Sequence, residues 1–337
     1  MRFDQSAFQG LQMDLVGVVE NPIPRGPIAG FFYGRDGAKL RYARWRPSAG
    51  ECHGTVCLFT GRGDFIEKYF EVISELRRRG FAVVTMDWRG QGRSARVLKN
   101  VHKGHINRFG QYDEDLACFM EQVVLPESPA PFFAMAHSMG ATIILRAGVN
   151  GSWFTRIVVL SPMIGLVFPL MPRSLARALA HILNLVGFGE VFVPGGHSRP
   201  LDLEPFAGNR LSSDPFRYQR TQKILEAEPG LGVGWPTIGW LDAAFDAMSE
   251  LKRAQFPTEV KVPILLFSAG ADQVVSNRAI EKMVPRIPAV RHIVIRGSRH
   301  EILMEKDYFR EQMWAAFDAF IPGAGRRTHP GIISSVS

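Results

Sequence analysis

The sequence contains only three cysteines in 337 residues, Cys52, Cys57 and Cys118, and their spacing fits neither a disulfide framework nor a metal site. A chain with so few cysteines is typical of a reducing compartment, and we expect a cytoplasmic protein. The N-terminus also lacks the basic segment and apolar core of a signal peptide. These absences argue against a small secreted scaffold.

The chain lacks an apolar run long enough to span a membrane. Its most apolar region is "MIGLVFPLMPRSLARALAHILNLVGFG", which is interrupted by Pro169, Pro172, Arg173 and Arg177. A spanning helix needs about 20 consecutive apolar residues, so this region is not one. A lid that faces a membrane is compatible with it, and the corresponding expectation is peripheral contact with the inner face of the membrane.

Concentrated positive charge is absent too, although the net charge is +8. The basic residues are scattered among acids and apolar residues, and no aromatic-basic RNA motif, zinc finger or basic helix stands out. We therefore expect no nucleic-acid partner and a mild preference for anionic surfaces such as phospholipid. A hydrophobic fraction of 46% and 24 phenylalanines indicate a chain that buries a sizeable core.

Apolar, β-branched runs recur along the chain, with helical patterns between several of them. The runs cover residues 54–59, 81–86, 132–136, 156–160, 264–268 and 291–295, and the clearest helical patterns cover 65–79 and 109–124. This alternation predicts an α/β fold with a mostly parallel central sheet and helices on both faces. Ahead of it, "FFYGRDGAKLRYARW" predicts an antiparallel hairpin at the sheet edge.

The alternation stops for about a hundred residues between the runs at 156–160 and 264–268. We interpret this block as a helical cap, residues 163–255, inserted into a core formed by residues 15–162 and 256–321. Such a cap would cover the carboxyl edge of the sheet, where ligands of open α/β sheets bind. Residues 322–337 are predicted to be a disordered tail.

One serine lies where the strand predicted at 132–136 turns into a helix, in "FFAMAHSMGATIILRAG". The small residues Ala136, Gly140 and Ala141 let that helix pass close to the strand. Ser138 would then project its hydroxyl above the sheet edge, and the amide of Met139 would point at an oxyanion formed beside it. A serine that only caps the helix is the alternative.

A nucleophilic serine needs a base and an orienting carboxylate, and two downstream loops supply them. Asp272 follows the run at 264–268, and His300 follows the run at 291–295. The order Ser, Asp, His is the one expected for an α/β-hydrolase, so we predict a triad of Ser138, Asp272 and His300. The turn in "LFTGRGDF" offers the backbone N–H of Arg62 as a second oxyanion donor beside Met139. The Arg62 side chain either meets a phosphate or is exposed with no such role.

Other polar residues are weaker candidates. Asp87 is expected to order its own loop, and His137 to be packed beside the nucleophile rather than to act as a second base. His102 and His105 lack a third ligand at metal-binding spacing. The predicted reaction needs no metal and no cofactor.

Six segments together resemble a known family: "FTGRGDFIEKYFEVISELRRRGFAVVTMDWRGQGRS", "AHSMGATI", "LSSDPFRYQRTQ", "GWPTIGW", "SAGADQVV" and "GSRHEILME". Their order is similar to the lysophospholipase L2 branch of the α/β-hydrolases, kin to the monoacylglycerol lipases and grouped with serine aminopeptidase-like hydrolases, over about residues 15 to 321. The resemblance implies the α/β-hydrolase fold and ester hydrolysis. It also implies the same triad and the same oxyanion amides, those of Arg62 and Met139.

These observations predict a serine esterase, and among serine esterases they favour a lysophospholipase. The apolar cap also carries arginines, which fits a single acyl chain with a charged head group; they are Arg173, Arg177, Arg199, Arg210 and Arg217. A carboxylesterase or monoacylglycerol lipase acting on neutral esters is the alternative. A proline-type aminopeptidase would need acids gathered in the cap, and a hydrolase-fold binding protein would usually lack a triad member.

Overall fold

The computed structural model describes residues 15–48, 50–151 and 153–324. Eight strands form one sheet in the order β1-β2-β4-β3-β5-β6-β7-β8. The pairs β1–β2 and β2–β4 are antiparallel, and all other neighbouring pairs are parallel. The strands are β1 Ile28–Tyr33, β2 Lys39–Trp45, β3 Thr55–Phe59, β4 Ala82–Met86, β5 Phe132–His137, β6 Arg156–Leu160, β7 Ile264–Ala269 and β8 Val290–Ile295. The mostly parallel sheet with an antiparallel edge hairpin is therefore confirmed.

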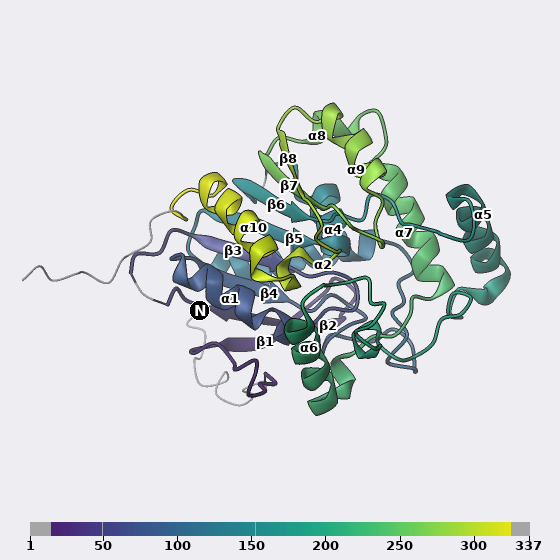
Figure 1. Ribbon diagram of the computed structural model, residues 1–337, viewed down its shortest axis with the longest axis horizontal. Helices are drawn as coiled ribbons and strands as arrows, with labels where there is room; N and C mark the ends of the chain where they lie inside the picture. Colours follow the sequence, from purple (N-terminus) through teal and green to yellow (C-terminus); the bar gives the residue numbers. More distant parts are fainter. Residues whose placement is uncertain (1–14, 49, 152, 325–337) are drawn as a thin grey trace, which may run out of the picture.

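Helices cover both faces of this sheet (Figure 1). One face packs against α1 and α10, and the other against α2, α4 and α9, with α7 packed on α4. The helices are α1 Phe70–Arg78, α2 Gly110–Phe119, α3 Leu125–Glu127, α4 Ser138–Ala147, α5 Arg173–Leu183, α6 Pro215–Ala227, α7 Ile238–Glu250, α8 Phe256–Glu259, α9 Asn277–Met283 and α10 Asp307–Phe320. The helical patterns predicted at 65–79 and 109–124 correspond to α1 and α2, each with an irregular turn at one end, Ile66–Tyr69 and Met120–Val124.

The inner strands are apolar along their whole length because both of their faces are covered. In β3, Val56 and Leu58 point into the core beneath α1 and α10, whereas Cys57 and Phe59 point into the core beneath α2 and α4. Side chains alternate between the faces of a strand, so a strand buried on both faces reads as a continuous apolar run. Each fully buried leucine or phenylalanine stabilises the fold by about 1.5–3 kcal/mol.

The insertion between β6 and β7 holds four α-helices, α5 to α8. They do not form one compact layer, because α6 lies apart from α5 and α7 (Figure 1). Helix α5 packs on α7, which also contacts α4, whereas α6 packs beside the turn that leads into α1. The predicted cap, 163–255, contains α5, α6 and α7, and α8 begins at Phe256 on the predicted core side. From residue 325 onward, the predicted tail lies outside the described residues.

Candidate active site

Ser138 occupies a tight corner between β5 and α4, and its backbone has φ +50°. A non-glycine residue in this left-handed region is strained by about 1–3 kcal/mol, and such strain persists only where the surroundings enforce it. Gly140 shows how tight the corner is, because a Cβ atom there would lie 2.4 Å from the carbonyl oxygen of Thr60. The sequence pattern of small residues around the serine therefore has a steric cause.

The three side chains predicted as a triad meet at the carboxyl edge of the sheet. His300 Nε2 lies 2.9 Å from Ser138 Oγ, and His300 Nδ1 lies 2.8 Å from Asp272 Oδ2. They come from the segments that follow β8, β5 and β7, strands that run parallel and so end at the same edge. Each neighbouring pair is within the hydrogen-bond reach that proton transfer requires.

The Asp272–His300 pair favours a positive charge on the imidazole. Burial alone would raise the pKa of Asp272, but the charge and hydrogen bond of His300, together with the amides of Val274 and Val275, hold it below its ordinary value. Burial alone would lower the pKa of His300, but the charge and hydrogen bond of Asp272 raise it above its ordinary value. This polarity supports a histidine that accepts a proton from Ser138 during reaction.

We expect kcat/KM for an ester to rise with pH as His300 loses its proton, with a midpoint above its ordinary pKa of 6.5. In Asp272→Asn the raising charge is lost, so the midpoint should move to lower pH and kcat should fall by about 10,000-fold. A matched control is Asp246→Asn, which changes an exposed cap carboxylate paired with Arg177. Identical midpoints for the wild type and Asp272→Asn would contradict the assigned role.

The loop after β3 brings a free amide close to Ser138. Its Gly61 lies against Ser138, because a Cβ atom there would be 3.3 Å from Ser138 Cβ. The amides of Gly61 and Gly63 donate to Asp64 Oδ2 at 2.8 Å and to Gln91 Oε1 at 3.1 Å. Among the described residues, the Arg62 amide between them has no acceptor.

The amide of Met139 is the second predicted donor. It lies in the first turn of α4, and the N-cap residue His137 makes no side-chain capping hydrogen bond. Amides in the first turn of a helix have no partner within the helix, and they carry the positive end of its dipole. The free amide of Arg62, next to Gly61, and the first-turn amide of Met139 thus fit the predicted oxyanion site.

A buried ionic cluster, which sequence reasoning missed, lies beside these residues. Lys68 Nζ is 2.9 Å from Asp64 Oδ1, 3.1 Å from Asp202 Oδ1 and 2.7 Å from Glu301 Oε1. The carboxylates hold the pKa of Lys68 well above its ordinary value against the opposing effect of burial, whereas burial raises the pKa of Glu301 to about 7. The cluster joins three segments: the loop of residues 60–64, which we call the oxyanion loop after its predicted role, the residue after His300, and the insertion.

Ser161 is a second residue that the sequence did not reveal. It follows β6 with φ +45°, and its hydroxyl donates a 2.8 Å hydrogen bond to the backbone oxygen of His300. Its own amide donates to Phe267 O in the neighbouring strand β7. Ser161 therefore fixes the backbone that carries the imidazole.

The weaker sequence candidates have other contacts. His137 packs against the His300 ring with centroids 4.8 Å apart, and burial lowers the pKa of His137 to about 3, so it remains neutral. Asp87 orders its loop by accepting hydrogen bonds from the amides of Ile66 and Arg93.

The histidines considered as a metal pair also have partners of their own. His102 Nδ1 lies 3.2 Å from Gly232 O, and His105 lies within hydrogen-bond distance of Thr237 Oγ1 and Asn107 Oδ1. Among the described residues, no third metal-ligating side chain joins them.

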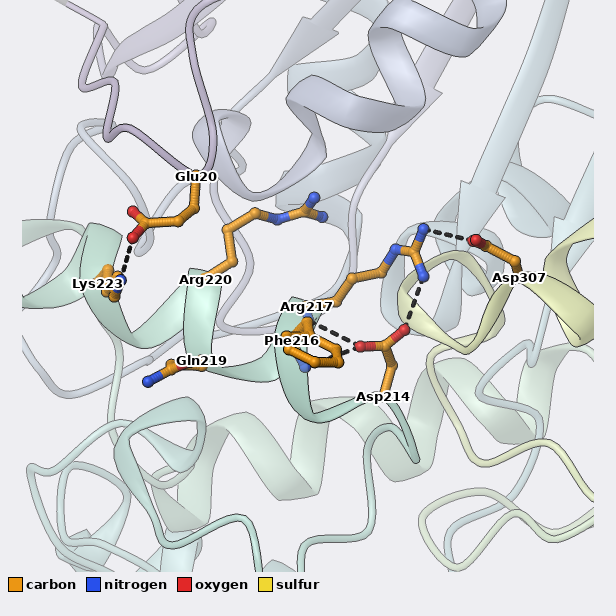
Figure 2. A pocket seen from close by; sticks show the side chains of 8 residues that line it. All are labelled: Glu20, Asp214, Phe216, Arg217, Gln219, Arg220, Lys223 and Asp307. Carbon is orange, nitrogen blue, oxygen red and sulfur yellow. Dashed lines mark hydrogen bonds and ion pairs between the residues drawn. The ribbon is translucent and has the colours of Figure 1, made fainter.

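A pocket of about 350 Å³ lies elsewhere, between α6 and the start of α10 (Figure 2). It is lined by Glu20, Asp214, Phe216, Arg217, Gln219, Arg220, Lys223 and Asp307, and no member of the predicted triad is among them. Arg217 lies between Asp214 and Asp307, and Lys223 pairs with Glu20 (Figure 2). These paired charges fasten α6 to the core, so Arg217 is not a free cap arginine of the kind we expected.

The fold, with a serine on the corner after β5, defines the class: the protein is an α/β-hydrolase. A family model described as serine aminopeptidase, S33, matches residues 50–307. Lysophospholipase L2 of Escherichia coli strain K12 is 32% identical over 90% of this chain and 92% of its own. The probable lysophospholipase L2 of Haemophilus influenzae is 28% identical over 86% and 91%.

Solved structures agree in fold. A monoglyceride lipase from Saccharomyces cerevisiae, solved with a substrate analogue, superposes with a TM-score of 0.70 at 18% identity, covering 90% of this chain and 99% of the other. A carboxyl esterase from Bacillus coagulans reaches a TM-score of 0.69 at 20% identity, covering 89% and 99%. The chain belongs to the serine aminopeptidase S33 family of α/β-hydrolases and is a serine hydrolase.

Proposed function

We propose that the protein is a lysophospholipase in which Ser138 is the nucleophile, His300 the general base and Asp272 the residue that orients the imidazole. His300 takes the serine proton while Ser138 Oγ attacks the ester carbonyl, and the amides of Met139 and Arg62 bind the resulting oxyanion. The head-group alcohol leaves with a proton from the imidazolium. Water, deprotonated by His300, then releases the fatty acid and restores Ser138. The main support for this mechanism is the 2.9 Å distance between His300 Nε2 and Ser138 Oγ, which is short enough for proton transfer.

Two observations support a lysophospholipid substrate. The chain is similar to the E. coli lysophospholipase L2 along almost all of both sequences, which includes the insertion. The insertion also presents many apolar side chains, as a substrate with one acyl chain requires, and few free acids. Of its acids, Asp242 lies within hydrogen-bond distance of Asn184 and His181, and Asp246 pairs with Arg177. Acids already engaged in this way do not favour binding of a peptide amine.

Turnover of a substrate panel tests the assignment. The panel holds lysophosphatidylcholine, lysophosphatidylethanolamine, monoacylglycerol, p-nitrophenyl butyrate and a proline aminoacyl amide. We expect kcat/KM for the lysolipids to exceed that for the neutral esters. Turnover of neutral esters alone would instead identify a carboxylesterase or monoacylglycerol lipase, and turnover of none would favour a non-catalytic binding protein.

A further part of this proposal is that α5 docks on the lipid surface that supplies the substrate. Among the described helices, none is long and apolar enough to cross a membrane. Helix α5 nevertheless exposes Leu175, Leu179 and Ile182, which lie on one face at spacings of four and three residues. Leu185, Val186 and Phe188 continue the exposed apolar surface beyond the helix. With the positive net charge of the chain, this surface has the character of an interfacial helix on an anionic bilayer.

Vesicle binding tests the docking surface. We expect Leu179→Asp/Ile182→Asp to lower the affinity for anionic phosphatidylglycerol vesicles by at least about 10-fold, because burying each side chain contributes about 1.5–3 kcal/mol. Phe216→Asp is the matched control, since Phe216 is 81% exposed but lies on α6. Equal losses in both variants, or none in either, would argue against α5, provided that thermal unfolding shows intact folds.

A further inference from the structure

Unlike Arg41 and Arg89, the partly buried Arg62 has no carboxylate partner among the described residues. Arg41 pairs with Glu67 and Asp87, and Arg89 pairs with Asp36 and Asp115. In the described part of the chain no carboxylate lies within ion-pair distance of the Arg62 guanidinium, and burial lowers the pKa of Arg62 to about 10. The group is still charged at neutral pH. A partly buried guanidinium with no carboxylate partner is suited to binding an anion from outside the chain.

The guanidinium is held firmly, yet it has unused donors. Nη2 donates a 2.8 Å hydrogen bond to the backbone oxygen of Gly234, and Cζ lies 5.1 Å from the ring centre of Trp240. A Cβ atom on Gly104 would lie 2.7 Å from Nη2, so the 104 backbone passes directly over the group. Nε is buried without a partner among the described residues, and Nη1 likewise makes no hydrogen bond there. An arginine fixed in this way presents donors that fit the oxygens of a phosphate.

The position of this charge relative to the reacting bond is set by the chain itself. The backbone amide of Arg62 is the proposed oxyanion donor, so the Cα atom of Arg62 lies close to the ester carbonyl of the substrate. The guanidinium is then held several bonds from that carbonyl by the arginine side chain. In a lysophospholipid, the glycerol unit likewise separates the ester carbonyl from the phosphate by several bonds. The cap arginines have no such tether, and Arg177 and Arg217 already pair with acids.

We propose that the Arg62 side chain binds the phosphate of the head group, so that one residue recognises both the carbonyl through its amide and the anion through its guanidinium. This inference rests on the proposed function and deepens it, because it makes a phosphate monoester or diester next to the acyl glycerol the recognised chemistry. Arg62 is on this account a specificity-determining residue. Neutral esters have no phosphate, so the Arg62 side chain does not contribute to their binding.

A matched pair of substrates tests the proposal: a 1-acyl lysophosphatidylglycerol and the 1-monoacylglycerol with the same acyl chain. The measured quantity is the ratio of their kcat/KM values, which cancels any general disturbance of the oxyanion loop. We expect Arg62→Met to lower this ratio by about 10- to 100-fold, mainly through KM for the phospholipid, because hydrogen bonds to charged groups contribute about 1.5–3 kcal/mol. Arg62→Lys keeps the charge but not the fork of donors, and it should restore part of the ratio.

Arg96 provides the matched control. It too has no carboxylate partner among the described residues, and its guanidinium also links the core to the insertion, through Gly90 O, Gly92 O and Gly230 O. Arg96→Met therefore removes a comparable link without removing the proposed anion site, and the substrate ratio should stay within about twofold of wild type. Equal decreases in the two variants, or a fall in both substrates alike in Arg62→Met, would overturn the proposal and leave Arg62 a structural residue.

Competition separates this inference from the proposed function. We expect sn-glycerol 3-phosphate to inhibit hydrolysis of p-nitrophenyl butyrate competitively in the wild type, and about 10-fold more weakly in Arg62→Met. This readout needs no lysophospholipid turnover, so it remains decisive if the lysophospholipase assignment fails. Absence of inhibition in the wild type, or equal inhibition in both proteins, would contradict an anion site at Arg62. Inhibition by inorganic phosphate as strong as that by glycerol 3-phosphate would also contradict it, because it would show that free phosphate, not a head group, is recognised.

Discussion

Ser138→Ala is expected to lose ester turnover almost completely, with kcat reduced by about 10,000- to 1,000,000-fold. Only the hydroxyl group is removed, and the proposed mechanism has no substitute for it, because in that mechanism His300 and Asp272 act through Ser138. Hydrolysis of p-nitrophenyl butyrate gives the rate. Mass spectrometry after treatment with an organophosphate shows whether the wild type, and not the variant, gains a covalent adduct on the peptide that contains residue 138.

Ser138→Gly supplies a control that separates catalysis from strain. Glycine adopts φ near +50° without a Cβ clash, so this variant should be as inactive as Ser138→Ala but more stable than it by about 1 kcal/mol. Thermal or urea unfolding measures that difference. Full activity in either variant would mean that another group is the nucleophile, and equal stability would mean that the corner is not strained in solution.

Much of the fold and the candidate triad could be predicted because their signals are local. The corner at Ser138 needs small residues within three positions, and those residues stand next to it in the sequence. Asp272 and His300 follow the ends of apolar runs, and parallel strands bring such ends to one sheet edge. The hairpin is equally local, because its two strands flank Asp36 and Gly37.

The features that were missed depend on contacts between distant parts of the chain. Lys68 meets Asp202 and Glu301 across 134 and 233 residues, and no pattern around Asp202 marks it as a partner. Arg217 was expected to be a free head-group residue, but it pairs with Glu71, 146 residues earlier. These ion pairs hold helix α6 against the core. Sequence patterns show that a segment is helical and charged, but not which charges meet after folding.

Lys68→Met should be strongly destabilising, lowering the free energy of unfolding by about 3–5 kcal/mol. The substitution keeps an unbranched side chain of similar length but leaves Asp64, Asp202 and Glu301 buried together without a cation. Activity should fall as well, because Asp64 holds the amide of Gly61 in the oxyanion loop and Glu301 follows His300. Urea unfolding at neutral pH, with ester turnover below the transition, measures both effects.

The pH dependence of that loss identifies its electrostatic origin. In the wild type the raised pKa of Lys68 means that its contribution is fully present below 10.5 and is lost only at higher pH. In Lys68→Met the three carboxylates repel one another when ionised, so the deficit should be larger at pH 8 than at pH 5, where protonation relieves it. Lys68→Met/Glu301→Gln should recover part of the stability at pH 8 and little at pH 5. Lys223→Met, which breaks the exposed pair with Glu20, should cause a much smaller loss. A deficit that is the same at both pH values would mean that Lys68 stabilises the protein by packing alone.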